Sequence, residues 1–371
     1  MPEPAHTPRG ATEADRESLR ALVGEVFRPS LMDEYPQLYH AETLGNCRVV
    51  EVGGDIVSHV GMTVQDAAIY GCRVRVACIG GVATHPDHRG NGYAGACLDD
   101  AIRVARESGT DIMMISGDRS LYRRAGCRRV GEEYSPSLSG EALAALDHSD
   151  LTLREATVAD IPTLRALHHG EPLHWKRDPD TWRRAMECGW VMNRKSRFVI
   201  VEAYGEAAGY VIVQDISDGE TWPQVSEYAG DRARMLRALA AYAADTEAPG
   251  MRWHVSGHDA FGLAVARAAG ARWPESTTSG TYVVLDLPQL LGRMRPYLTE
   301  YLGGADALRV EPIGDGYRFD LDGATHHVPD IGCAAHFVFG TREDRPTAAP
   351  TSGPLADAFP IPALFYGLNY V

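Results

Sequence analysis

A cluster of glycines among charged residues opens the stretch THPDHRGNGYAGACLDD, residues 84–100. It follows the strand-like run VRVACIGGVAT, residues 74–84, and leads into a helix-periodic apolar run that begins at Tyr93. Backbone N–H groups at such a strand-to-helix junction point at one spot, and the helix dipole adds positive potential there. Glycine lets a ligand come close to the backbone. The junction therefore predicts an anion site, most naturally for phosphate or pyrophosphate.

The spacing of these residues differs from two common phosphate motifs. No GKS or GKT is present, which excludes a Walker loop, and the glycines do not fit GxGxxG. The pattern is Arg-x-x-Gly-x-Ala, preceded by a Val-Ala-Thr strand end. A second motif follows in DIMMISGDRSLYRRAGCRRVG, residues 111–131, where an apolar strand leads to Leu-Tyr-x-x-x-Gly around Tyr122.

These two motifs together resemble the GCN5-related N-acetyltransferase (GNAT) superfamily, in which (Arg/Gln)-x-x-Gly-x-(Gly/Ala) cradles the pyrophosphate of coenzyme A. The resemblance implies that acetyl-CoA is the co-substrate. An ordinary tight turn is the alternative interpretation of the glycines. The residues expected to bind the cofactor are Val82, Ala83, Thr84, Arg89, Gly90, Asn91, Gly92, Tyr93, Ala94 and Gly95.

Acetyl transfer to an amine needs a polarised thioester carbonyl, a deprotonated amine and a proton for the departing thiolate. Backbone N–H groups near Val82 could polarise the carbonyl. The resemblance assigns the acid role to Tyr122, and the alternative is that Tyr122 only packs over coenzyme A. No covalent acyl-enzyme is expected, because no triad accompanies the cysteines near the motifs.

The general base is harder to place, because the strand ACIGGVAT contains no carboxylate. In Eis-like (enhanced intracellular survival) acetyltransferases, a subfamily that this chain resembles, the C-terminal carboxylate lies in the active site. Here that group would belong to Val371. The apolar tail FPIPALFYGLNYV suits a buried end. The alternative is that the tail completes a sheet.

An internal repeat divides the chain. RGATEADRESLRALV at 9–23 and REATVADIPTLRALH at 154–168 are identical at nine of fifteen positions. Both contain Thr-x-x-Asp before an apolar helical pattern, a variant of the capping box. This repeat predicts two copies of one fold.

A second pair of segments supports the repeat. RVVEVGGDIVSHVGM at 48–62 and RFVIVEAYGEAAGYVIV at 197–213 each have the pattern of a strand, a turn and a strand. The second copy contains no RxxGxA in VSEYAGDRARMLRALAAYA, residues 225–243. We therefore expect a degenerate GNAT fold there, without cofactor.

The predicted fold class is α/β (α+β), with three domains: a catalytic GNAT domain at 1–150, a degenerate GNAT domain at 151–280 and a third domain at 281–371. In the third domain TYVVLDLPQLLGRMRPYLTEYL predicts a strand and an amphipathic helix, and short runs predict a small antiparallel sheet: LRVEP, YRFDLDG, THHVP and CAAHFVFG. REDRPTAAPTSGPLAD predicts a mobile loop. The Eis-like resemblance implies a sterol-carrier-protein-like fold for this domain, and a homo-oligomer, either trimer or hexamer.

Composition restricts the function classes. The 371 residues are 44% hydrophobic and 23% charged, typical of globular proteins, and exceed one ordinary core. A net charge of −14 argues against a nucleic-acid partner. No apolar run could span a bilayer, and the polar N-terminus lacks a signal-peptide pattern, so we expect no membrane partner and a cytoplasmic location. The seven scattered cysteines and the histidines of HHGEPLHW and THHVPD lack ligand spacing, so no metal site is predicted.

The sequence thus favours an acetyl-CoA-dependent N-acetyltransferase that acts on an amine of a cationic small molecule, aminoglycoside-like or polyamine-like, by direct attack in a ternary complex. Asp33, Glu34 and Tyr39 lie where the superfamily walls the acceptor site, although a solvated loop is equally plausible there. Two alternatives are a biosynthetic acetyltransferase with a narrow substrate and a non-catalytic protein that senses coenzyme A or another ligand.

Overall fold

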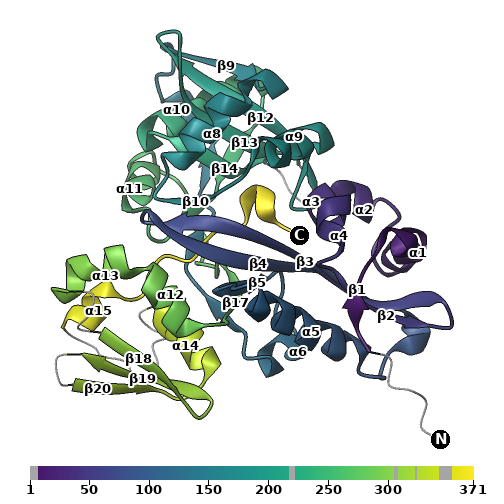
Figure 1. Ribbon diagram of the computed structural model, residues 1–371. Helices are drawn as coiled ribbons and strands as arrows, with labels where there is room; N and C mark the ends of the chain where they lie inside the picture. The colour runs from purple at the N-terminus through teal and green to yellow at the C-terminus, as the bar shows by residue number, and fades with distance from the viewer. Residues whose placement is uncertain (1–6, 217–221, 305–307, 322–323, 342–352) are drawn as a thin grey trace, which may run out of the picture. The chain divides into compact units, whose positions relative to one another are not determined.

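The structure is a computed structural model that describes residues 7–216, 222–304, 308–321, 324–341 and 353–371. Its contacts group the chain into two compact units (Figure 1). Unit 1 contains residues 1–130, 280–361 and 369–371, and unit 2 contains residues 131–279 and 362–368. Neither unit is one continuous segment. The three domains expected at 1–150, 151–280 and 281–371 remain a prediction.

Unit 1 is built on a long twisted sheet whose strands follow the order β1-β2-β3-β4-β5-β17-β6. Strands β1 to β4 pair antiparallel in sequence order, β4 and β5 are parallel, and β17 runs antiparallel to both of its neighbours. The strands are β1 (Arg9–Gly10), β2 (Arg48–Val52), β3 (Asp55–Ile69), β4 (Cys72–Thr84), β5 (Ile112–Ile115), β6 (Arg128–Val130) and β17 (Gly280–Val284).

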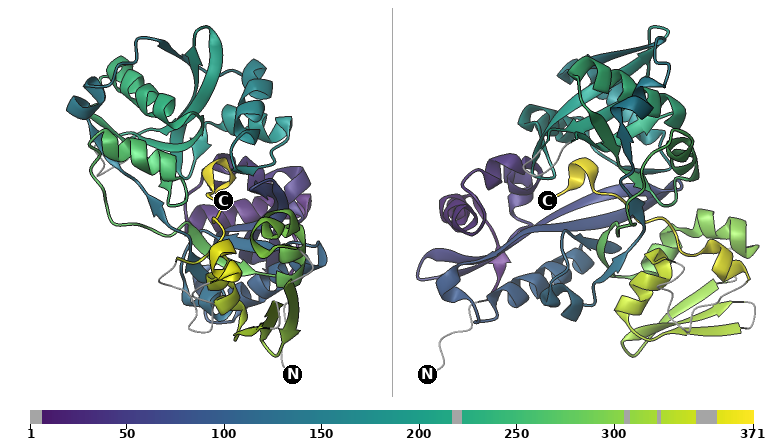
Figure 2. Two further views of the ribbon diagram at one scale, coloured as in Figure 1. Left: turned by 90° about the vertical axis from the view of Figure 1, so that its left-hand side faces the viewer. Right: turned by 180° about the vertical axis from the view of Figure 1, so that it is seen from behind.

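Helices cover both faces of this sheet (Figures 1 and 2). Helix α5 (Tyr93–Glu107) packs Cys97, Leu98, Ala101 and Ala105 against one face, where they form a common core with residues of β3, β4 and β5. The other helices of this region are α1 (Arg16–Val26), α2 (Leu31–Glu34), α3 (Pro36–Tyr39), α4 (Ala41–Leu44) and α6 (Ser120–Arg124). The sheet and α5 thereby hold the strand-to-helix junction between two rigid elements.

A β-bulge interrupts β4 just before this junction. Gly61 of β3 pairs with Gly80, whereas His59 pairs with Ala83. Between these two pairs β4 therefore contains one residue more than β3. Gly81 supplies the extra residue with φ at 58°, a left-handed conformation that favours glycine. The last parallel pair of β4 and β5 is Ile79 with Ile115. Beyond it the two strands part.

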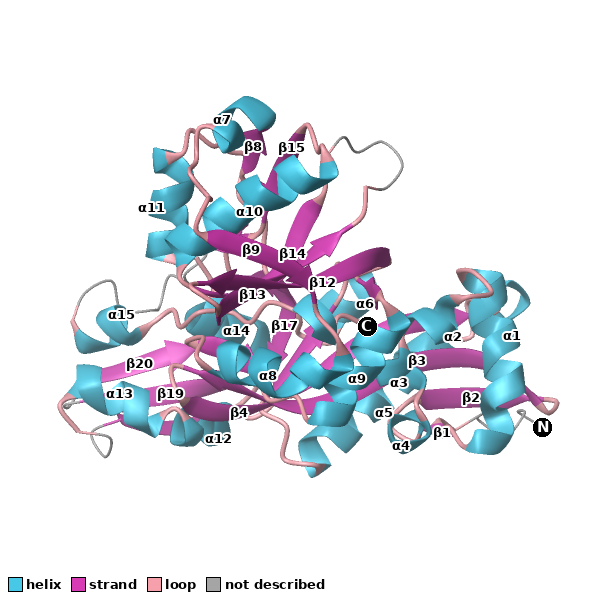
Figure 3. Cartoon of the chain, turned by 90° about the horizontal axis from the view of Figure 1, so that it is seen from above, coloured by secondary structure: helices cyan, strands magenta, loops and turns pink. Residues whose placement is uncertain are grey.

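Unit 2 has the same plan, with strand order β11-β12-β13-β14-β15-β8 and β9 paired to β12 (Figure 3). Its strands are β8 (Ser137–Ser139), β9 (Leu151–Glu155), β11 (Trp190–Val191), β12 (Arg194–Ala203), β13 (Glu206–Gln214), β14 (Gln224–Gly230) and β15 (Gly250–Trp253). Its main helices are α8 (Ile161–His169), α9 (Pro179–Cys188), α10 (Arg232–Thr246) and α11 (Ala260–Ala268). As in unit 1, one parallel pair, β14 and β15, follows an antiparallel hairpin.

The two capping boxes that the repeat predicts are confirmed, one in each unit. Thr12 with Asp15, and Thr157 with Asp160, each form a complete capping box. An arginine nearby pairs with each capping carboxylate. Arg9 lies 2.7 Å from Asp15, and Arg154 lies 2.7 Å from Asp160.

Each sheet is completed by a strand from outside its own repeat. In unit 1, β17 pairs antiparallel with β5, although it follows the second repeat in the chain. In unit 2, β8 pairs antiparallel with β15, although it precedes the second repeat. The two repeats have therefore exchanged equivalent strands.

The third segment forms a three-stranded antiparallel sheet with helices over one face (Figures 1 and 2). Its elements are α12 (Leu287–Arg293), α13 (Arg295–Leu302), β18 (Leu308–Ile313), β19 (Gly316–Leu321), β20 (Ala324–Val328), α14 (Ile331–Phe339) and α15 (Pro354–Ala358). The single amphipathic helix expected here is two helices, divided at Met294 before a proline in the first turn of α13. Residues 342–352 of the expected loop lie outside the described residues.

One strand prediction was wrong, because CAAHFVFG lies in helix α14. The side chain of Asp330 caps this helix by accepting a hydrogen bond from the Cys333 N–H at 2.8 Å. Most of the helix is buried, so its sequence is apolar on nearly every face and carries no clear helical periodicity.

Candidate active site

The glycine cluster forms an open cradle between β4 and α5. Gly90 and Gly92 have φ of 85° and 80°, where a side chain would be strained. Apart from the glycine itself and its two neighbours in the chain, no atom of the described residues lies within 4 Å of the position that a Cβ would take on either residue. Arg89 and Asn91 beside them are exposed. The backbone here is open to a ligand, and this space is what a side chain would fill.

The start of α5 leaves its backbone donors to such a ligand. Gly92 is the N-cap, and it offers no side-chain cap. The Ala96 N–H donates to Gly92 O at 3.0 Å, the first hydrogen bond of this helix, so the N–H groups of Ala94 and Gly95 have no carbonyl partner within the helix. A 15-residue helix adds a positive partial charge at this end. The Arg89 Nε donates to Thr84 O at 3.4 Å, which keeps a guanidinium beside the cradle.

At the equivalent junction in unit 2, backbone N–H groups donate to the protein's own carboxylates. Glu171 accepts from the Gly230 N–H at 2.8 Å, and Asp231 caps α10 by accepting from Arg234 N at 2.9 Å. Arg232 is held by Glu171 at 2.6 Å and Asp259 at 2.5 Å. A cavity of about 620 Å³ lies here. Its carboxylates disfavour a second anion, which gives a physical reason for the missing motif.

Val371 lies on β4 where the sheet parts. The side chain of Ser116, just after β5, donates to Val371 O at 3.1 Å. A Cβ on Gly80 would collide with the Val371 carbonyl group, so glycine leaves the room that this residue needs. Gln37 donates to Tyr370 O at 2.7 Å. Within the described segment 353–371 the chain adds no strand, which excludes the sheet-completing alternative for the tail.

Tyr122 lies at the same end of β5. Its ring carbon Cε2 is 3.5 Å from the Cβ position of Gly117, the residue after Ser116. The side chain is 4% exposed, and burial raises the pKa of its hydroxyl. The phenol therefore stays protonated at neutral pH. Tyr122 and the Val371 backbone oxygen thus both lie beside the Ser116–Gly117 turn.

The expected acceptor wall divides into paired carboxylates and a buried tyrosine. Asp33 is exposed and accepts two hydrogen bonds from Arg20, at 2.8 and 2.9 Å, which lower its pKa. Glu34 is buried and pairs with Arg28, and it also accepts from Ser30 Oγ at 2.6 Å. These arginines neutralise both charges, so the two carboxylates offer little attraction to a cationic acceptor.

Tyr39 lies deeper than expected, against His59, which sequence reasoning missed. Both side chains are almost fully buried, and their rings stack with centroids 5.7 Å apart. His59 Nδ1 is 2.7 Å from Gly81 O, at the bulge of β4. The signal in the sequence was a histidine within the apolar run DIVSHVGM of a strand next to the motif strand.

A second buried network, in unit 2, holds the segment before the last three residues. Arg177 and Glu227 form a bidentate pair at 2.6 and 2.7 Å. Glu227 also accepts from Tyr210 Oη at 2.9 Å and from the Leu368 N–H at 3.0 Å. His168 Nδ1 is 2.8 Å from Tyr210 Oη. This network ties residues 362–368 into unit 2.

The cysteines provide no nucleophile near the motifs. Cys47, Cys72, Cys78, Cys97 and Cys127 are buried, and only Cys188 and Cys333 of the seven are partly exposed. Burial raises the pKa of the Cys47, Cys78, Cys97 and Cys127 thiols to about 12. Thiols in this state are inert as nucleophiles at neutral pH.

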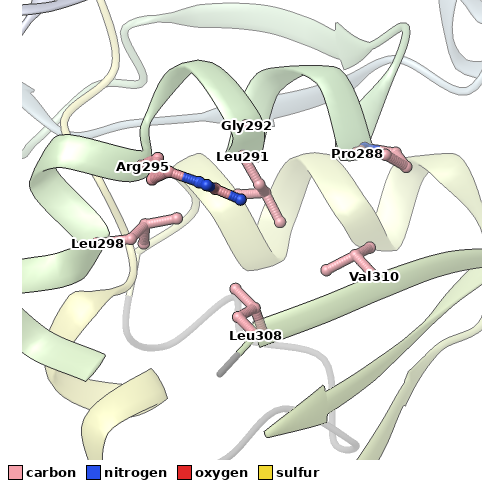
Figure 4. Close-up of a pocket in the computed structure, with 7 residues that line it drawn as sticks. All are labelled: Pro288, Leu291, Gly292, Arg295, Leu298, Leu308 and Val310. Carbon is pink, nitrogen blue, oxygen red and sulfur yellow. The ribbon is translucent and has the colours of Figure 1, made fainter. Parts of the chain in front are cut away.

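Other candidate features lie away from the junction. A cavity of about 140 Å³ lies between α12, α13 and β18, lined by apolar side chains and by Arg295 (Figure 4). Among the described residues, no group of three or more His, Cys, Asp and Glu side chains could hold a metal ion. No helix in the described part of the chain has the length and apolar character to cross a membrane.

Comparison with known families bears on the junction directly. Residues 7–130 match the family model of the acetyltransferase (GNAT) domain, a range that contains the cradle and Tyr122. The first repeat is a GNAT acetyltransferase domain. The chain is accordingly an N-acetyltransferase by class, and its mixed α/β architecture is that of a GNAT-type fold. A search of curated protein sequences finds no match.

Solved structures share this fold over most of the chain. A GCN5-related N-acetyltransferase from Anabaena variabilis is 15% identical, with a TM-score of 0.65 over 96% of this chain and 97% of that one. Eis1 from Mycobacterium abscessus is 15% identical, with a TM-score of 0.59 over 88% of each chain. A probable N-acyltransferase from Enterococcus faecalis is 14% identical, with a TM-score of 0.63 over 77% of this chain and 74% of that one. At these identities the likeness shows the fold alone.

Proposed function

We propose that this GNAT enzyme transfers the acetyl group of acetyl-CoA to an amine of a cationic small molecule, by direct attack in a ternary complex. The observation that carries the proposal is the open glycine cradle at the uncapped N-terminus of α5, directly after the bulged strand. The N–H groups of Ala94 and Gly95 would bond the pyrophosphate, with Arg89 beside them. We place one such site in the chain, in unit 1.

The reaction needs three groups of this chain. The Val82 N–H polarises the thioester carbonyl as the amine nitrogen attacks its carbon. The Val371 carboxylate takes the proton from the amine, directly or through one water. Tyr122 gives its proton to the sulfur as the C–S bond breaks, and solvent then reprotonates the phenolate. An acceptor that arrives as an ammonium group gives one proton to the carboxylate before the attack and loses a second proton to solvent as the amide forms. The products are an acetamide, free coenzyme A and one proton, so atoms and charge balance.

The preference for a cationic acceptor depends on the carboxylate of Val371. Asp33 and Glu34 are neutralised by Arg20 and Arg28, so these two carboxylates do not attract a cationic acceptor. A carboxylate next to the attacking nitrogen favours an ammonium group as the arriving form. Aminoglycosides and polyamines both offer such groups. A trimer or hexamer and a sterol-carrier-protein-like third domain are carried only by the Eis-like resemblance, and a cytoplasmic location is carried only by the composition of the sequence.

The test is release of free thiol from acetyl-CoA against a panel of aminoglycosides, polyamines, peptides and neutral amines. We expect turnover with polycationic amines, and acetamide formation confirmed by mass spectrometry. Turnover of one uncharged amine alone would favour the narrow biosynthetic alternative. Tight acetyl-CoA binding without turnover of any amine would favour a sensing protein.

A further inference from the structure

The bulge in β4 is controlled by a histidine from the neighbouring strand. His59 is fully buried, and its Nδ1 is 2.7 Å from the carbonyl oxygen of Gly81. A carbonyl oxygen can only accept, so Nδ1 carries the proton and Nε2 is left as a bare acceptor. Burial lowers the pKa of His59 to about 4, so this neutral ring persists over the working pH range.

The hydrogen bond at Gly81 sets the direction of the next N–H. In a trans peptide the C=O of one residue and the N–H of the next point in opposite directions. Because Gly81 O faces His59, the Val82 N–H is held facing away from His59. Glycine at φ 58° could adopt other peptide orientations at little cost, so this bond selects one of them.

Tyr39 closes the same bulge from α3. A Cβ on Gly81 would lie 2.5 Å from Tyr39 Oη and 3.3 Å from His59 Cε1. Tyr39 Oη and His59 Nε2 are both buried and make no hydrogen bond within the described residues. Two unpaired buried polar atoms are costly to the fold. Their presence at one bulge indicates that the stacked pair is kept for something other than stability.

We infer that His59, supported by Tyr39, is a positioning residue that aims the Val82 N–H at the thioester carbonyl oxygen of bound acetyl-CoA. His59 does not touch the substrate; it acts through the Gly81–Val82 peptide. The inference rests on the proposed function, because it names the part that orients the carbonyl-polarising donor. Loss of one such donor costs about 10²–10³-fold in kcat in other enzymes.

The decisive variants separate the two ring nitrogens. In His59→Asn the amide NH₂ can take the place of Nδ1, whereas in His59→Gln it reaches the place of Nε2. We expect His59→Asn to keep kcat within about tenfold and His59→Gln to lose about 10²-fold or more, with KM for acetyl-CoA unchanged in both. His148→Gln, in a surface loop of unit 2, is the matched control and should behave as wild type.

A spectroscopic readout removes the need to know the acceptor. Acetyl-CoA carrying ¹³C at the thioester carbonyl is bound to the protein, and its carbonyl stretch is measured by infrared difference spectroscopy. Polarisation by Val82 N–H lowers this frequency. Wild type and His59→Asn should show the lowered frequency, and His59→Gln should show one closer to that of free acetyl-CoA.

The outcomes are separable from the fate of the proposed function. If wild type does not bind acetyl-CoA, the proposed function fails. If it binds and His59→Gln keeps the wild-type frequency, or His59→Asn loses it as fully as His59→Gln, this inference alone is overturned. Should the variants not fold, ¹⁵N NMR of histidine in wild type decides: a protonated Nδ1 with a bare Nε2 supports the inference, and the opposite tautomer overturns it.

Discussion

Tyr122 is a buried phenol whose pKa burial raises, so it holds its proton until the thiolate forms beside it. We predict that Tyr122→Phe folds and binds acetyl-CoA as wild type does but loses kcat by ~100-fold or more, since a general acid is removed without changing ring packing. Calorimetry gives the affinity and single-turnover acetyl transfer gives the rate. An unchanged single-turnover rate would leave Tyr122 with a packing role only.

Val371 offers a change at the base without altering any side chain. Residues appended after Val371 convert its carboxylate into an amide and remove the charge beside Ser116. We predict normal acetyl-CoA binding and at least tenfold slower turnover in the extended chain, because the amine then loses its proton acceptor. The control is the same extension placed at the N-terminus. If the C-terminal extension turns over at the wild-type rate, the proton acceptor is another group.

Some site residues could be predicted from the sequence and others could not, and the difference has a physical reason. The cradle could be predicted because backbone groups form it, and the glycines at 90 and 92 indicate an unusual backbone conformation in the sequence itself. His59 could not, because its importance arises from pairing with β4 across a bulge, and the register of that pairing is not visible in either strand alone. The same holds for Asp33 and Glu34, whose pairing with Arg20 and Arg28 depends on how short helices pack.

At the scale of elements, a side chain added at the open N-terminus of α5 should weaken the binding of acetyl-CoA. We predict that Gly92→Val lowers acetyl-CoA affinity by at least 100-fold, because the side chain fills the cradle in front of the N–H groups. Gly71→Val is the matched control: Gly71 has φ of 79°, against 80° for Gly92, and equally open surroundings in the β3–β4 turn. Both variants bear the same backbone strain, so equal affinity loss in the two would refute a cradle-specific effect.

The buried network of α8, β13 and β14 makes unit 2 sensitive to acid. Burial lowers the pKa of His168 to about 3, while in the unfolded chain it is near 6.5. The unfolded state alone takes up this proton as pH falls below about 6.5, so stability falls there. Burial alone would raise the pKa of Glu227, but Arg177 lowers it to about 2. In the unfolded chain the pKa of a glutamate is about 4.3, so a second loss of stability begins as the pH falls below that value.

We predict that the free energy of unfolding of unit 2 falls by about 1.6 kcal/mol between pH 6.5 and pH 5, from His168 alone. Urea unfolding followed by the tryptophans Trp182 and Trp253, both buried in unit 2, gives the measurement. In NMR the imidazole of His168 should stay neutral at pH 5. A His168 resonance that titrates near 6.5 would contradict the predicted origin of this loss.

The elements that sequence predicted well are those with local signals. Both capping boxes and both strand–turn–strand segments follow from a few adjacent residues, and the structure contains them at the expected places. Helix α14 was predicted as a strand because an apolar run of this length suits either element, and its cap at Asp330 was the signal that could have decided. The break between α12 and α13 follows from Pro296, which was visible in the sequence.

At the scale of the whole molecule, the exchange of β8 and β17 makes each half of the chain incomplete. A fragment of residues 1–150 lacks β17, so β5 loses the partners of Met113 and Ile115. A fragment of residues 151–371 lacks β8, the partner of β15. We predict that neither fragment folds alone and that the two, co-expressed, purify together. Full acetyl-CoA affinity in the 1–150 fragment alone would contradict this. The sequence could show the repeat but not the exchange of β8 and β17, because the residues of a short strand do not indicate which strand it pairs with.

The burial of most cysteines has a practical consequence for anyone who measures this enzyme. Each turnover would release one coenzyme A thiol, and a colorimetric disulfide reagent counts such thiols. The same reagent also reacts with the protein. Here Cys188 and Cys333 are the partly exposed cysteines, and the five buried thiols lie within folded cores. The background should therefore be a small, early step of about two thiols per chain, and any slow rise in that background would report unfolding rather than catalysis.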